Sequence, residues 1–127
     1  MTAALLAIAF QLLPAPTLPR WHIVARDAQA DYAVDPESIE QQGLRVRAAV
    51  RQRYRRPPPA APAAGVTRRL YDCRADRVRS EAADLYDAGA RFLGTVQSRA
   101  DQLQDLPFGA ASPNARLRAY LCGRWWR

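Results

Sequence analysis

Arginine is the residue type with the clearest chemical pattern in this chain. Within residues 44–54 arginine alternates with apolar residues, and alternate side chains of an extended strand point to the same face. These arginines are Arg45, Arg47, Arg51 and Arg53. If the segments 44–54 and 67–73 pair with each other, Arg68 and Arg74 lie beside them. Because guanidinium groups bind phosphate, sulfate and carboxylate, the pattern predicts a face for an acidic polymer or partner, and the alternative is a solvated outer face without a ligand.

Charge is unevenly distributed along the sequence. The chain has 127 residues, 19 basic and 12 acidic, for a net charge of +7, and every basic residue is arginine. Residues 44–79 hold 11 arginines and 2 aspartates, a local charge of +9, whereas the rest of the chain carries −2. The positive charge is therefore regional. The length, with 49% hydrophobic residues, fits one small domain and excludes a multidomain enzyme and a fully disordered chain.

Groups that could carry catalysis are few. His22 is the only histidine, and Cys73 and Cys122 do not form the closely spaced pairs that bind zinc. No serine or cysteine has a matched base, and the sequence has no glycine-rich phosphate loop and no metal-ligand spacing. Asp35 and Glu37 lie near a turn, which we expect them to shape. We therefore predict a non-enzymatic protein without metal or cofactor, and the alternative is a small envelope enzyme that uses His22.

The N-terminal segment is typical of an export signal. Residues 3–13 form an apolar run of 11 residues, which is too short to span a bilayer and fits the hydrophobic region of a signal peptide. The alternative is an N-terminal core helix of a cytosolic protein. We predict a signal-peptide-like segment at 1–19, a domain at 20–123 and a C-terminal tail at 124–127, with no transmembrane span.

The two cysteines have two interpretations. An even number of cysteines fits one disulfide if the chain is exported, and two buried free thiols fit a cytosolic protein. A bridge between Cys73 and Cys122 would close a loop of roughly 50 residues, which the chain-entropy model values at about 4 kcal/mol.

Several further segments have strand patterns. Segment 44–54 is the clearest, because its apolar and basic residues alternate along its length. Shorter strands are expected at 21–25, 32–35, 67–73, 77–86 and 91–96, with Val78, Ala82 and Tyr86 pointing inward. The proline-rich stretch 57–65 is expected to be an exposed loop because proline cannot donate to a strand ladder.

The C-terminal segment changes to a helical period. Ser112 and Pro113 have the residue types of an N-cap and a first helical position. Leu117, Tyr120 and Leu121 then share one face, and Gly123 is expected to end the helix. The predicted fold is α+β: an antiparallel sheet of about six strands, covered by one C-terminal helix, with one disulfide.

Several short motifs, taken in order, resemble the surface-adhesin protein E family of Gram-negative bacteria. The resemblance covers residues 21–123. It is carried by Trp21, the segment Tyr32–Ile39, Tyr71-Asp72-Cys73 with Arg77 following, Tyr86, and Ser112-Pro113-Asn114 leading to Leu121-Cys122-Gly123.

The resemblance implies a fold, a compartment and a class of partner. It implies an antiparallel sheet with a packed C-terminal helix, a Cys73–Cys122 bridge, and export to the periplasm or the cell surface. It also implies binding of host matrix proteins such as vitronectin and laminin, and the formation of a homodimer. The chain departs from the namesake at one point, because no cysteine near position 20 provides a site for a lipid anchor.

The residues themselves bear on three other partner classes. Acidic envelope polymers would suit the arginine pattern of a periplasmic structural or polyanion-binding protein that has no host ligand. Nucleic acid is not favoured, because segment 44–54 lacks the interleaved aromatic residues on which bases stack. Trp125 and Trp126 lie outside the family pattern; they could meet a membrane interface or pack on the edge of the domain.

Overall fold

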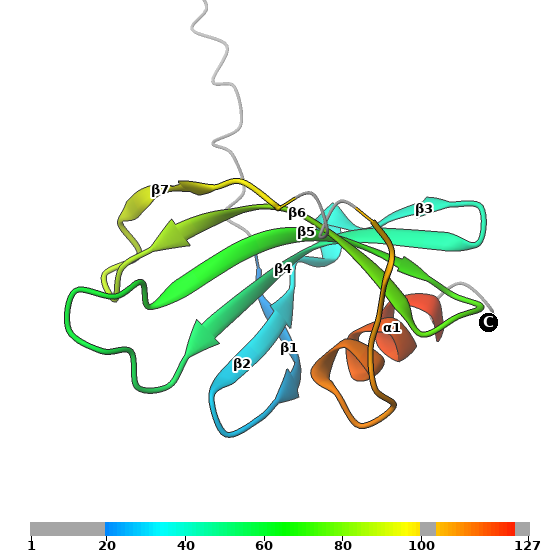
Figure 1. Cartoon of the computed structure of the whole chain (residues 1–127), viewed down its shortest axis with the longest axis horizontal. Helices are drawn as coiled ribbons and strands as arrows, with labels where there is room; N and C mark the ends of the chain where they lie inside the picture. The colour runs from blue at the N-terminus through cyan, green and yellow to red at the C-terminus, as the bar shows by residue number, and fades with distance from the viewer. Residues whose placement is uncertain (1–19, 100–103, 124–127) are drawn as a thin grey trace, which may run out of the picture.

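One antiparallel sheet forms most of the molecule. The computed structural model describes residues 20–99 and 104–123. The eight strands have the order β1-β2-β4-β5-β6-β7, with β3 pairing with β4 and β8 pairing with β6 (Figure 1). The strands are β1 His22–Arg26, β2 Ala30–Val34, β3 Glu40–Gln42, β4 Arg45–Tyr54, β5 Ala64–Asp72, β6 Arg77–Tyr86, β7 Phe92–Val96 and β8 Leu106–Pro107. A short 3₁₀ helix, η1 (Pro36–Ser38), follows β2, and α1 (Pro113–Gly123) ends the described chain.

Strand β4 divides the sheet into two chemically different faces. Val46, Ala48 and Val50 are buried on one face, and the arginines between them point to the other. Because β4 is bonded to β2 and β3 on one side and to β5 along its whole length on the other, its alternation fixes the faces of its neighbours. The predicted strand at 44–54 and its two faces are confirmed.

Helix α1 covers one end of the apolar face. It begins after Ser112, whose hydroxyl accepts from the Ala115 N–H at 3.3 Å, and Pro113 opens its first turn. Leu117 and Leu121 are fully buried and close the core over β1, β2 and β4. Figure 1 shows the helix under one end of the sheet, on the side of β3, whereas β7 lies at the opposite end. The predicted antiparallel sheet with one C-terminal helix is confirmed.

Polar contacts and a disulfide fix α1 to β5. The buried Tyr71 hydroxyl donates to Asn114 Oδ1 at 2.7 Å, and Arg69 Nη1 donates to the same atom at 2.8 Å. Burial raises the pKa of the Tyr71 phenol, which keeps its proton on the donor. Cys73 and Cys122 form a disulfide with a Cα–Cα distance of 5.6 Å, as the family resemblance implied. Both ends of the helix are therefore tied to the same strand and the turn that follows it.

A bulge overturns the expected faces of β6. Val78 pairs with Tyr71 and lies in the core, as expected. The register between β5 and β6 shifts between Thr67 and Arg69. The residues of β6 beyond this shift therefore point to the face opposite to the one that simple alternation from Val78 predicts. Tyr86 consequently pairs with Ala64 and points to the arginine side of the sheet, where its ring lies 5.8 Å from that of Phe92.

Other boundaries differ in smaller ways. Strands β3 and β8 were not expected, and β5 begins at Ala64, inside the stretch expected to be a loop. Gly43, with φ of +63°, makes the turn that joins β3 to β4. The predicted segments 1–19 and 124–127 lie outside the described residues. Within the described chain, no helix has the length and apolar character needed to cross a membrane.

Removing the disulfide tests its share of the stability. The Cys73→Ser/Cys122→Ser variant should lose about 4 kcal/mol of unfolding free energy, because its unfolded chain is no longer restrained. Urea unfolding of the oxidised protein, the reduced protein and the variant measures this loss. The reduced protein should match the variant. A loss below about 1 kcal/mol in both would contradict the role given to the bridge.

A double-mutant cycle tests the Asn114 anchor. Asn114→Ala should cost about 1–3 kcal/mol, because it leaves the buried Tyr71 hydroxyl without an acceptor. In a Tyr71→Phe background the same change should cost less, since that hydroxyl is gone. Additive losses in urea unfolding would mean that the two side chains are not coupled.

Candidate functional site

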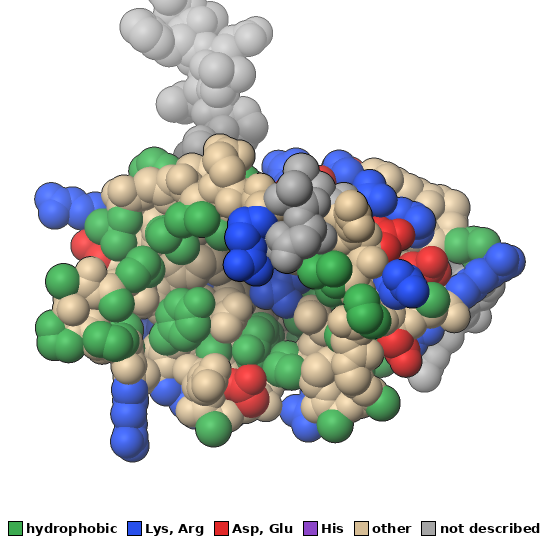
Figure 2. Space-filling model, viewed as in Figure 1, with side chains coloured by type: hydrophobic (Ala, Val, Ile, Leu, Met, Phe, Trp, Pro, Cys, Tyr) green, Lys and Arg blue, Asp and Glu red, His purple; other side chains and the backbone are tan. Residues whose placement is uncertain are grey.

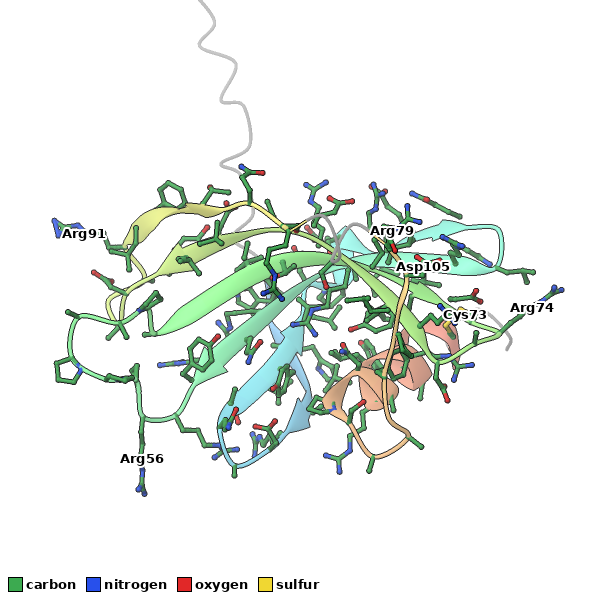
Figure 3. All side chains as sticks on the ribbon, in the orientation of Figure 1. Arg56, Cys73, Arg74, Arg79, Arg91 and Asp105 are labelled. Carbon is green, nitrogen blue, oxygen red and sulfur yellow. A yellow bond between two sulfur atoms is a disulfide. The ribbon has the colours of Figure 1, made fainter. Side chains whose placement is uncertain are left out.

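The sheet gathers five of the predicted arginines on one surface, here named the Arg face. Its members are Arg45, Arg47, Arg51, Arg53 and Arg68. The pairing of Ala49 with Arg68 places Arg68 beside β4, between the positions of Arg47 and Arg51. Arg74 does not join this face. It lies in the exposed turn between β5 and β6 and extends away from the body of the domain (Figure 3).

At one end of the Arg face, carboxylates neutralise the arginines. The two side-chain oxygens of Asp105 accept from Arg45 Nη2 at 3.0 Å and from Arg79 Nε at 3.2 Å, and Arg79 and Asp105 lie together in Figure 3. Arg77 donates to the Asp105 backbone carbonyl at 3.2 Å. Arg47 pairs with Glu81 at 3.1 Å. This end is therefore a network of mixed charge, which sequence analysis missed because Asp105 is distant along the chain.

At the other end, the arginines form no ion pair with a carboxylate of the described chain, although the charge of Asp31 acts on Arg51. Arg51 lies over the Trp21 ring, 5.1 Å from the ring centroid, and its Nε is buried without a hydrogen bond. Burial lowers the pKa of Arg51, and the charge of Arg53 lowers it further. Arg53 and Arg68 make no ion pair with any residue that the structure describes. The positive charge of the Arg face is thus concentrated at this end.

A cleft of about 460 Å³ opens beside Arg51 and Arg53. Trp21 and Asp31 stand on one side of it, the turn after β6 on the other, and Val66 and Tyr86 add apolar surface. Trp21 was singled out from the sequence only as the start of the family resemblance. No periodic signal places it against an arginine that is 30 positions away.

Apolar side chains remain exposed where α1 does not reach, in a region named here the uncovered end. It consists of the ends of β4 and β6 that carry Tyr54 and Leu85, together with β7. On β7, Phe92, Leu93 and Val96 are 57%, 50% and 54% exposed. A hollow of about 510 Å³ is lined there by Tyr54, Leu85 and the proline-rich loop.

The space-filling view separates the two ends of the molecule. Figure 2 shows hydrophobic side chains gathered where β7 and the loop between β4 and β5 lie in Figure 1. Basic and acidic side chains are mixed at the opposite end, near β3 and α1. The uncovered end is therefore the less polar part of the viewed face.

The histidine and Asp35 have structural contacts in the described chain. The His22 ring stacks on Tyr120 with centroids 5.4 Å apart, which accounts for its position at the edge of the sheet. Among the described residues no group of three or more histidines, cysteines or carboxylates could hold a metal ion. Asp35 caps η1 by accepting from the Glu37 N–H at 3.0 Å, a structural role.

Asp105→Asn tests the charge network. Losing the carboxylate removes two charge-assisted contacts, so the variant should lose roughly 1 kcal/mol of unfolding free energy in low salt. The loss should shrink in 500 mM NaCl, because salt screens partly exposed charges. Asp76→Asn is the matched control, since Asp76 has one longer contact, 3.4 Å to Arg118. Equal losses in the two variants by urea unfolding would contradict a special role for Asp105.

Comparison with known proteins identifies the family of this chain. A search of curated proteins found no match, and a search of solved structures found none either. The family model of surface-adhesin protein E matches residues 21–123, which is the entire described domain apart from Arg20. Family membership suggests an adhesin-like binding role, and family membership together with the disulfide suggests an exported protein. The match extends from Trp21, beside Arg51, to the residue after the disulfide. Because it covers most of the chain, the chain belongs to the surface-adhesin protein E family.

Proposed function

We propose that this protein is a non-enzymatic binding module of the cell envelope that attaches to host extracellular-matrix proteins through its uncovered end. Residues 1–19 would direct export to the periplasm or cell surface, and the domain from residue 20 would be the mature module. Family membership supports the class of partner, and vitronectin and laminin are the partners that the resemblance implies. The observation that carries the location is the exposed apolar surface of β7.

The β7 strand has the properties of a protein-binding edge. It is the last strand of the sheet order, so one side of its backbone has no strand partner among the described residues. Its five residues carry no charge, and native proteins commonly protect an open edge with charged residues or proline. Exposed apolar patches on soluble domains mark interaction sites. Phe92, Leu93 and Val96 would supply apolar contacts while the β7 backbone pairs with an extended partner segment.

A second candidate function is binding of an acidic polymer of the envelope on the Arg face. It is favoured by the arginines that lack acidic partners, namely Arg51, Arg53 and Arg68. Arg45 and Arg47 are already paired with Asp105 and Glu81, so they would contribute less. The binding would therefore be centred on one end of the face and would weaken steeply with salt.

Binding to immobilised vitronectin and laminin, measured for the oxidised full chain, tests the uncovered end. The Phe92→Ser/Val96→Ser variant should bind at least about tenfold more weakly, because it removes buried apolar contacts from the interface. Leu44→Ser/Leu106→Ser is the matched control, since both leucines are 37% exposed and lie outside this end. The control should bind as the unchanged protein does.

The two candidate functions differ in their response to salt and to charge reversal. Adhesion through β7 should persist from 50 to 500 mM NaCl and survive Arg51→Glu/Arg53→Glu/Arg68→Glu, since it depends on apolar contacts. Salt-sensitive binding to heparin or lipopolysaccharide, lost in that charge-reversal variant, would replace adhesion by the second function. Loss of matrix binding in the Leu44/Leu106 control would contradict the assignment to the uncovered end.

A further inference from the structure

We infer that the cleft beside Trp21 is a binding site for a small carboxylate with a flat, largely apolar ring. This site is distinct from the β7 edge, and the inference holds whether or not the protein binds a matrix protein. It rests on three features of the cleft: two available guanidinium groups, carboxylates that are already engaged, and apolar walls of suitable size.

Arg51 provides the principal cation. Its guanidinium group lies over the Trp21 ring at 5.1 Å, which holds the planar group in place. Unlike Arg47, which pairs with Glu81, and Arg69, which binds Asn114, it makes no hydrogen bond or ion pair through its side chain in the described structure, although the charge of Asp31 acts on it. Its buried Nε lacks an acceptor, as do those of Arg47 and Arg69. A carboxylate can accept from two guanidinium nitrogens at once, which would complete the bonding of this side chain.

Arg53 is the second cation and follows Arg51 on the same face of β4. The two positive charges repel each other, and a bound anion would relieve that repulsion. Arg53 is exposed, so it would guide and hold the anion from the rim of the cleft. The two arginines therefore bring two positive charges to the cleft, and neither forms an ion pair with a carboxylate of the described chain.

Both acidic residues of the cleft are engaged with other partners, although the charge of Asp31 also acts on Arg51. Asp31 accepts from Arg55 Nη2 at 2.7 Å and lies 3.7 Å from Arg26 Nε. Asp87 Oδ1 accepts from the backbone N–H groups of Gly89 and Arg91, each at 2.9 Å. Because two carboxylates lie in the same cleft, a singly charged anion suits it better than a dianion such as a phosphate monoester.

The walls of the cleft define the body of the ligand. Ala64, Val66 and Tyr86 contribute apolar surface opposite Trp21, and the volume of about 460 Å³ lies within the range of small-molecule sites. A ring of one or two fused cycles would fill this space with its carboxylate directed to Arg51. A long polyanion would extend toward arginines that Asp105 and Glu81 already neutralise.

Titration of the full, ¹⁵N-labelled chain with 2-naphthoate tests the site. The Arg51 Nε–H and Trp21 indole N–H signals should shift in a saturable manner. The neutral isostere 2-naphthylmethanol and the dianion 2-naphthyl phosphate should each bind at least about tenfold more weakly, because one lacks the charge and the other is repelled by Asp31 and Asp87. Displacement of 2-naphthoate by phenylacetate would support an aromatic acid as the natural source of the carboxylate.

Three substitutions separate the cleft from general charge effects. Arg51→Gln should weaken 2-naphthoate binding by about tenfold or more, and Arg53→Gln by a few-fold, in line with the loss of charge-assisted hydrogen bonds. Arg68→Gln is the matched control, since Arg68 lies on the same face without an acidic partner but does not line the cleft. It should leave the affinity unchanged.

A variant that fills the cleft provides a second test if Arg51→Gln does not fold. Val66→Phe fills the apolar floor and leaves both arginines in place, so it should abolish 2-naphthoate binding. Each of four outcomes would overturn the inference: no saturable shift, equal binding of 2-naphthylmethanol, equal loss in Arg68→Gln, or full affinity in Val66→Phe.

Discussion

The limited reach of helix α1 is the constraint on which the rest of the structure depends. An 11-residue helix covers only part of a sheet whose longest strands have ten residues each. Where Leu117 and Leu121 meet the sheet, the protein has a closed core, fixed by Asn114 and the disulfide. Beyond that contact, no helix of the described chain covers the apolar face. Stability is therefore concentrated at one end of the domain, and the surfaces available for binding at the other.

On the opposite face of the sheet, the main constraint is the balance between arginines and the carboxylates that neutralise them. No helix among residues 20–99 and 104–123 covers this face, so alternate residues of β4 can be arginines that remain in contact with water. Acidic side chains from distant parts of the chain neutralise one end, with Asp105 joining two arginines through its two oxygens. Arg51 and Arg53 form no ion pair with a described carboxylate and line the cleft that we propose as an anion site. The local charge of +9 in the sequence is thus unevenly neutralised along the face.

Local patterns predicted much of this fold, and long-range contacts did not follow from them. Alternation identified β4, and the Ser112-Pro113 cap with helical spacing identified α1. The reversed face of Tyr86 was missed because a one-residue bulge leaves no periodic signal. The neutralising role of Asp105 and the contact of Trp21 with Arg51 depend on how distant strands are brought together. The arginines of the site were therefore predictable, but which of them stay available was not.

Native-state hydrogen exchange tests this division of the domain most directly. Amides under α1, such as those of Val46 and Tyr71, should exchange only through global unfolding, because their core must open first. Amides of β7 and of the first residues of β5 should exchange through smaller openings, with free energies lower by about 2 kcal/mol or more. A single free energy of exchange across both ends of the sheet would contradict the account, because it would mean that α1 does not divide the domain into a fixed end and an available one.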